Sequence, residues 1–209
     1  MSRWILLRGL TRESRHWGGF VDTLHNRFPN DEVLTLDLSG NGVLNNMQSP
    51  LTVAAMTEHC RSDLKRRGVT EPVRVLAMSL GAMVAIDWAS RYPAEIECAV
   101  LINTSLRGIS PFYQRLRIGN YPALLKHIFL RSRARAWEQT ILRLTTRHPP
   151  DAQRILNDWV RWHEARPVST SNALRQLLAA ARFAAPSNAP HCPLLILAAK
   201  EDGLVDAKC

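Results

Sequence analysis

Ser79 stands where an apolar run, VRVLAM at residues 73–78, gives way to a helix-like pattern from 82 to 90. A serine hydroxyl becomes a nucleophile when the chain exposes it and a neighbouring base takes its proton. The letters around it, A-M-S-L-G, differ from the G-x-S-x-G pattern of a nucleophile elbow only at Ala77. Because alanine is also small, strand and helix can still approach closely at this turn. We therefore predict that Ser79 is an exposed nucleophile, the alternative being an ordinary turn residue.

Apolar runs and helical patterns alternate along most of the chain around this turn. Continuous apolar strands of this kind are typical of a parallel sheet covered on both faces. Residues 106–185 interrupt the alternation with a mostly helical segment. We predict an α/β fold with a doubly wound, mostly parallel sheet in residues 1–105 and 186–209, and a helical lid inserted at 106–185. The predicted strands are 4–7, 32–38, 73–78, 96–103 and 193–199, and the predicted helices of the core are 17–28, 52–67 and 82–90.

Three further segments support one family resemblance. WILLRGL at the start is similar to a strand that supplies an oxyanion-hole amide, and DLSGNG at residues 37–42 is similar to a D-x-P-G-x-G turn. PLLILAAKEDGLVD near the end is similar to a late strand followed by the acid of a catalytic triad. With the elbow, these segments resemble the α/β-hydrolase superfamily, especially its small lidded serine carboxylesterases. Some of those cleave esters of acids bound to acyl carrier protein.

The resemblance implies catalytic roles for four positions. Ser79 would attack an acyl carbon, and the backbone N–H groups of Leu10 and Leu80 would hold the oxyanion. Asp202 would be the triad acid that orients a histidine and stabilises its charged form. Another acid of the same loop could take that place, since Glu201 and Asp206 lie nearby in the sequence.

Two positions are expected to contact the substrate. Arg8 replaces the histidine that usually precedes Gly9 in the family, and Met78 precedes the nucleophile. A guanidinium at Arg8 could bind a substrate carboxylate or form a structural ion pair. No cofactor or metal site is expected, because the four cysteines show no metal-type spacing.

The histidine of the triad has no counterpart after Asp202, because the chain ends seven residues later. His16, His25 and His59 fall on predicted core helices, and His191 precedes the last strand. His127, His148 and His163 belong to the lid and could reach the site only by an unusual arrangement.

We therefore expect a truncated fold that lacks its last strand and closing helix. Such a fold would expose an apolar edge, and it would be poorly stable or rescued by dimerisation. Hydrolysis would be weak without a base. The alternative is a non-catalytic ligand-binding protein of the same fold.

The net charge of +9 is concentrated in the lid. Residues 106–182 hold thirteen Arg and one Lys against four acidic residues. No nucleic-acid motif occurs, and aromatic residues are not interleaved with the basic ones. A helical charge face is often merely solvated. The sharper hypothesis is that lid arginines bind an acidic carrier protein or a phosphorylated acyl group. These arginines are Arg115, Arg117, Arg131, Arg133 and Arg135.

The composition is that of an ordinary globular protein, with 46% apolar and 22% charged residues. No apolar run approaches the roughly 18 residues of a membrane span, and the start lacks a signal-peptide core. We expect a cytoplasmic protein whose cysteines are reduced thiols and whose substrate is a small acyl ester or thioester.

Overall fold

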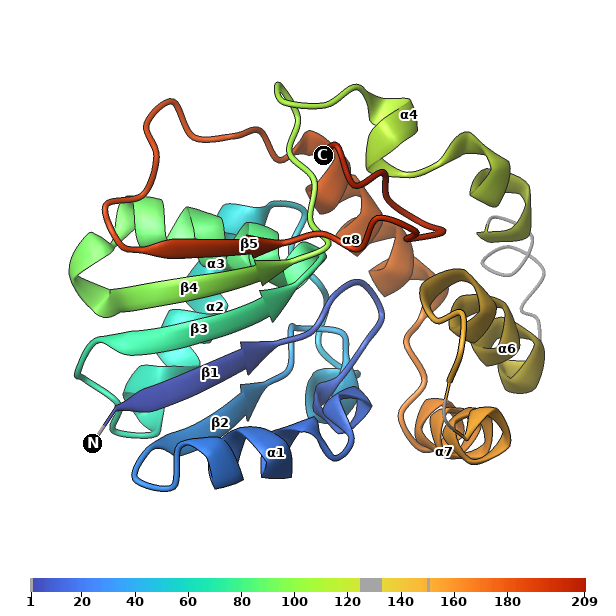
Figure 1. The fold of residues 1–209 in the computed structure, drawn as a ribbon, viewed down its shortest axis with the longest axis horizontal. Helices are drawn as coiled ribbons and strands as arrows, with labels where there is room; N and C mark the ends of the chain where they lie inside the picture. Colours follow the sequence, from blue (N-terminus) through green and yellow to red (C-terminus); the bar gives the residue numbers. More distant parts are fainter. Residues whose placement is uncertain (1, 125–132, 150) are drawn as a thin grey trace.

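The computed structural model describes residues 2–124, 133–149 and 151–209. Five parallel strands form one sheet in the order β2-β1-β3-β4-β5 (Figure 1). The predicted parallel sheet and all five predicted strands are confirmed. The strands are β1 (Arg3–Leu7), β2 (Glu32–Leu36), β3 (Val73–Met78), β4 (Ile96–Ile102) and β5 (Leu194–Leu197).

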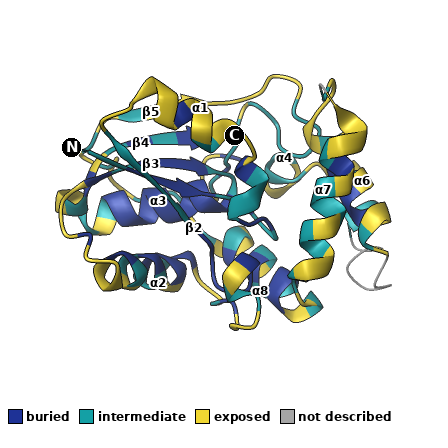
Figure 2. Cartoon of the chain, turned by 90° about the horizontal axis from the view of Figure 1, so that it is seen from below, coloured by how far each residue is buried: buried dark blue, intermediate teal, exposed yellow. Residues whose placement is uncertain are grey.

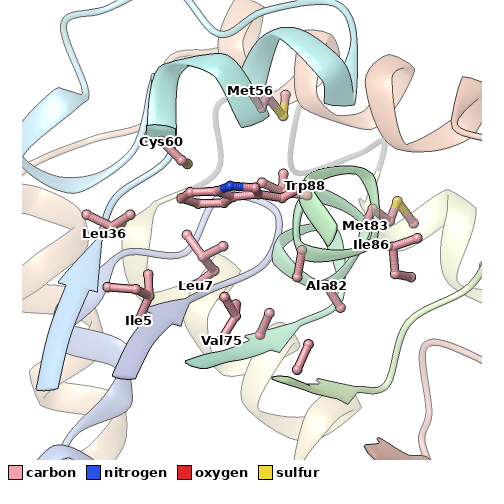
Figure 3. Packing of buried hydrophobic residues seen from close by; sticks show 14 of the residues in the cluster. Ile5, Leu7, Leu36, Met56, Cys60, Val75, Ala82, Met83, Ile86 and Trp88 are labelled. Atoms are coloured by element: carbon pink, nitrogen blue, oxygen red, sulfur yellow. The ribbon is translucent and has the colours of Figure 1, made fainter. Parts of the chain in front are cut away.

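Helices cover both faces of the sheet. The helix α1 (Phe20–Arg27) lies on one face, and α2 (Val53–Arg66) and α3 (Leu80–Arg91) lie on the other. The ring of Trp88 lies between Met56 of α2 and Leu7 of β1 in the larger core (Figure 3). A buried indole removes more apolar area from water than any other side chain, so this layer is a main source of stability.

The lid is helical, as the sequence predicts. Its helices include α4 (Phe112–Arg115), α6 (Ala134–Thr145), α7 (Ala152–Ala165) and α8 (Thr170–Arg182). In Figure 1, α8 lies between the sheet and the pair α6 and α7. Figure 2 shows that α3 is buried along most of its length, whereas α6 and α7 have exposed outer faces. The lid contacts the core through α8, whose Gln176 accepts a hydrogen bond from Thr11 N–H, and through α6, whose Glu138 pairs with Arg12.

The strand β5 forms one edge of the sheet. Its side chains Leu195, Ile196 and Leu197 are 54%, 63% and 44% exposed. The expected apolar edge is thus confirmed, and it is an unusual feature because proteins ordinarily cover or charge such strands. None of the helices in the three described ranges has the length and hydropathy of a membrane span.

Candidate active site

The turn between β3 and α3 holds Ser79 in a strained conformation. Its φ is 54° and its ψ is −117°, a region that costs a non-glycine residue on the order of 1–3 kcal/mol. Two hydrogen bonds fix the turn: Ser79 N–H donates to Ile102 O at 2.9 Å, and Thr104 Oγ1 donates to Ser79 O at 3.0 Å. The neighbouring strand end therefore maintains the strain that turns this serine away from the sheet.

Close packing explains the small residues around the turn. A Cβ added to Gly81 would lie 2.6 Å from Arg8 O and 2.7 Å from Leu7 O, so only glycine fits there. A Cβ on Gly9 would lie 3.3 Å from Ser79 Oγ, which places the loop after β1 against the hydroxyl. Ala77 is completely buried, and its methyl group is accommodated where the elbow pattern has its first glycine.

Two backbone N–H groups are available beside the nucleophile. Across the parts of the chain with described coordinates, neither Leu10 N–H nor Leu80 N–H donates a hydrogen bond. Leu80 begins α3, so its N–H lies at the positive end of the helix dipole. Both residues line one cavity with Ser79. The arrangement suits an oxyanion next to the hydroxyl.

A buried amide network holds the loop that carries Leu10. Thr11 N–H donates to Gln176 Oε1 at 2.9 Å, and Gln176 Nε2 donates to Asn41 Oδ1 at 2.7 Å. Asn41 Nδ2 in turn donates to Arg12 O at 2.9 Å. Gln176 and Asn41 are both completely buried. The sequence patterns assign no role to either residue: Asn41 belongs to the DLSGNG turn, and Gln176 is a glutamine within the apolar stretch of α8.

The cavity has a volume of about 300 Å³, at the small end of the range for small-molecule sites. It brings together the predicted residues Ser79, Leu10, Leu80, Arg8 and Met78. Most of the remaining wall is apolar and comes from the lid. Those lid residues include Phe112, Leu116, Trp137, Ile141, Trp159 and Leu177.

Arg8 has an unusual environment in this cavity. Its guanidinium carbon lies 4.9 Å from the centroid of the Trp17 ring, and its Nε is buried without a hydrogen-bond partner. Burial lowers the pKa of Arg8 to about 10, and the positive charge of Arg12 adds to the effect. The guanidinium nevertheless stays protonated at neutral pH.

Asp202 lies outside the cavity wall. Its Oδ1 accepts hydrogen bonds from Leu204 N–H at 2.7 Å and Val205 N–H at 3.1 Å, so it stabilises a turn. Leu204 and Val205 themselves line the cavity. Of the alternative acids, Glu201 pairs with exposed Arg147 at 2.9 Å, and Asp206 accepts from Lys208 N–H. The assignment of Asp202 as triad acid stays a prediction.

No histidine whose position is described lines the cavity. His16 contacts Arg12 through Nε2 at 2.8 Å, and burial lowers its pKa to about 2, with Arg12 and Arg8 contributing. His163 bonds Glu138 at 2.8 Å, and Glu138 also pairs with Arg12 at 2.6 Å. His127 lies outside the described residues. His25, His59, His148 and His191 do not contribute to the wall.

Comparisons with known proteins identify the family of the chain and the structures that share its fold. A sequence model of the family described as serine aminopeptidase, S33, matches residues 30–208. No curated protein sequence matches the chain at a significant level.

Three solved structures share the fold at low sequence identity. An esterase from Rhodococcus sp. ECU1013 is 19% identical, with a TM-score of 0.74, over 99% of this chain and 75% of its own. A hydrolase from Pseudomonas aeruginosa PA01 is 17% identical, with a TM-score of 0.72, over 95% and 72%. The enol-lactonase from Burkholderia xenovorans LB400 is 18% identical, with a TM-score of 0.70, over 93% and 71%. At these identities the likeness concerns the fold alone.

Proposed function

Because the chain belongs to the serine aminopeptidase S33 family of α/β-hydrolases, we propose that it hydrolyses a carboxylic ester or thioester through Ser79. The observation that carries this proposal is the strained φ of 54° at Ser79 beside two N–H groups, those of Leu10 and Leu80, that have no acceptor in the described ranges. Strain of this kind persists where the surroundings enforce it, and it is concentrated at functional sites.

The geometry supports acyl transfer in two steps. Ser79 Oγ would attack the acyl carbon, and the oxyanion would receive hydrogen bonds from Leu10 N–H and Leu80 N–H. One such donor is worth about 3 kcal/mol in the transition state. The alcohol or thiol would then leave, and water would release the acid from the acyl-enzyme.

The cavity wall favours an ester or thioester over the peptide substrate of an aminopeptidase, the activity that the family description names. An aminopeptidase has to hold the substrate's terminal ammonium group, for which a carboxylate is the natural partner. The described part of the cavity wall contains Arg8, Arg12 and Arg115 but neither Asp nor Glu. Arg12 is paired with Glu138, but Arg8 has no acidic partner in the described ranges and would repel an ammonium group.

No histidine in the described part of the cavity wall can act as a base for Ser79, so we expect slow turnover. Without a base, a serine site retains only the rate supplied by its oxyanion hole and by binding. The same observation favours a second candidate function, a ligand-binding protein that performs no chemistry.

Chemical rescue separates the two candidates. The rate of p-nitrophenyl butyrate hydrolysis would be measured against imidazole concentration, with Ser79→Ala as the matched control. The hydrolase proposal predicts a saturable increase that requires Ser79, because imidazole can enter the cavity and accept the proton. A rate that Ser79→Ala does not change at any imidazole concentration would leave only the ligand-binding candidate.

We also propose that an acidic carrier protein presents the acyl group to the lid. Arg117, Arg133 and Arg135 are exposed, whereas Arg115 donates to Ala180 O at 2.7 Å and is partly withdrawn from solvent. Arg131 lies outside the described residues. Charge steering of this kind weakens with salt. Activity on a carrier-linked acyl group should therefore fall with salt more steeply than activity on a p-nitrophenyl ester, and equal salt responses would contradict the proposal.

A further inference from the structure

The arginines that line the cavity differ in how their charge is used. Arg12 forms a buried ion pair with Glu138 at 2.6 Å, the two side chains being 8% and 2% exposed. Arg115 donates from both Nη atoms, to Ala181 O at 2.9 Å and Ala180 O at 2.7 Å. Arg8 makes neither a hydrogen bond nor an ion pair with any group in the described ranges. It is therefore the lining arginine with its donors unused.

The remaining residues cannot supply the missing carboxylate. Residues 125–132, together with Met1 and Pro150, contain no Asp or Glu. Every acidic side chain of residues 1–209 therefore lies in the described ranges, and none of them lines the cavity. The charge of Arg8 is thus not neutralised by this chain.

The position of Arg8 makes an unpaired charge costly. Trp17, which is 7% exposed, covers one side of the guanidinium of Arg8. The Nε of Arg8 is shielded from water. Stacking on an indole recovers part of the desolvation cost, but it leaves the buried Nε–H without an acceptor and the Nη groups without a partner in the described ranges. A partly desolvated guanidinium with free donors is a binding group for a planar anion.

We propose that Arg8 binds a carboxylate of the substrate, so that the preferred substrate is an ester or thioester that also carries a carboxylate. Only the ester part of this inference rests on the proposed function. Arg8 would bind a carboxylate whether or not Ser79 hydrolyses the ester. A single unneutralised guanidinium matches the single charge of a carboxylate and its two oxygens. Arg8 and Ser79 line the same cavity, so a carboxylate bound at Arg8 would lie in the cavity that holds the reacting carbonyl.

The experiment measures binding rather than turnover. Monomethyl glutarate and dimethyl glutarate differ in one charge and one methyl group, and both would be titrated by NMR into the Ser79→Ala protein. We expect the monoester to bind roughly tenfold or more tightly, as expected for a hydrogen bond to a charged group. The indole N–H signal of Trp17 should shift with the monoester, since this ring touches the guanidinium.

Variants of Arg8 identify the group responsible. Arg8→Gln should remove the preference for the monoester, and Arg8→Lys should keep part of it, because the charge remains while the fork geometry is lost. Arg27→Gln is the matched control: it removes one exposed arginine of α1 and should keep the full preference.

Three results would overturn the proposal. The first is equal binding of monoester and diester, a comparison that needs no change at Arg8 and so does not depend on how the variants fold. The second is an Arg8→Gln protein in which both ligands weaken alike, as a purely structural arginine predicts. The third is tighter binding of butyl phosphate than of the monoester, which would assign the site to phosphate. A failure of Ser79-dependent hydrolysis alone would reject the proposed function and leave the anion site standing.

Discussion

Replacing Gln176 by methionine tests how the lid supports the oxyanion loop. The glutamine comes from α8 and is completely buried, and its amide joins Thr11 N–H to the Oδ1 of Asn41. Methionine has a similar length and volume but no donor or strong acceptor, so the exchange removes hydrogen bonds with little change in packing.

The magnitude follows from the groups left behind. Ser49 Oγ keeps its own bond to Ser39 O at 2.6 Å, so the change leaves two interior groups unpaired, Thr11 N–H and Asn41 Oδ1. Each unsatisfied group costs about 1–3 kcal/mol. The apolar methionine offsets part of this loss. We expect the free energy of unfolding to fall by about 3 kcal/mol.

Urea denaturation with an unchanged m-value measures this loss, and reaction of Ser79 with a fluorophosphonate measures its effect on the site. The labelling rate should fall by about tenfold, less than the 10²–10³ lost when an oxyanion donor is deleted outright. Gln153→Met on exposed α7 is the control and should change neither quantity. A Gln176→Met protein as stable and as reactive as the unaltered one would refute the role of this network.

Three further changes test the lid, the buried histidine and the elbow. Glu138→Leu leaves the buried guanidinium of Arg12 unpaired and should lower the free energy of unfolding by about 3–5 kcal/mol in urea; equal midpoints would contradict this. His16 stays uncharged when folded, with a pKa of about 2, whereas the unfolded chain takes up a proton below about pH 6.5. Stability should thus fall with decreasing pH by about 1.4 kcal/mol per unit from this group, and His16→Phe should flatten the pH profile between about 6.5 and 5; an unchanged slope would count against it. Gly81→Ala places a Cβ 2.6 Å from a main-chain oxygen and should cost about 2 kcal/mol or more, whereas Gly19→Ala meets nothing within 4 Å and should not destabilise; similar melting of both would show that the elbow tolerates a side chain.

The parallel sheet and the elbow could be predicted because their signals are local. The run at 73–78 is a mostly buried strand in which every residue except Arg74 is apolar, and Gly81 marks the close approach of helix and strand. Small residues at fixed offsets from Ser79 carry this information within a few letters. The resemblance of WILLRGL and of the elbow to the α/β-hydrolase family indicated Arg8, Leu10 and Leu80, and all three line the cavity.

The hydrogen bonds and ion pairs that support the site could not be predicted, because the residues that form each pair are far apart in the sequence. Gln176 and Asn41 are separated by 135 positions, and Arg12 and Glu138 by 126. No local sequence pattern indicates which residue a buried polar side chain of a helix will contact. The packing of α8 and α6 against the core brings these groups together. The hydrogen bonds that Asp202 accepts could not be predicted for a similar reason, because the turn after β5 follows no periodic pattern.

We propose that Ser79 is a nucleophile that the strained turn between β3 and α3 exposes to the cavity. Mass spectrometry of the intact and digested protein after fluorophosphonate treatment, with imidazole present as base, tests it most directly. We expect one adduct per chain, located on Ser79 and absent from Ser79→Ala. A well-folded protein that gains no adduct, or gains it on another residue, would show that Ser79 is not the nucleophile.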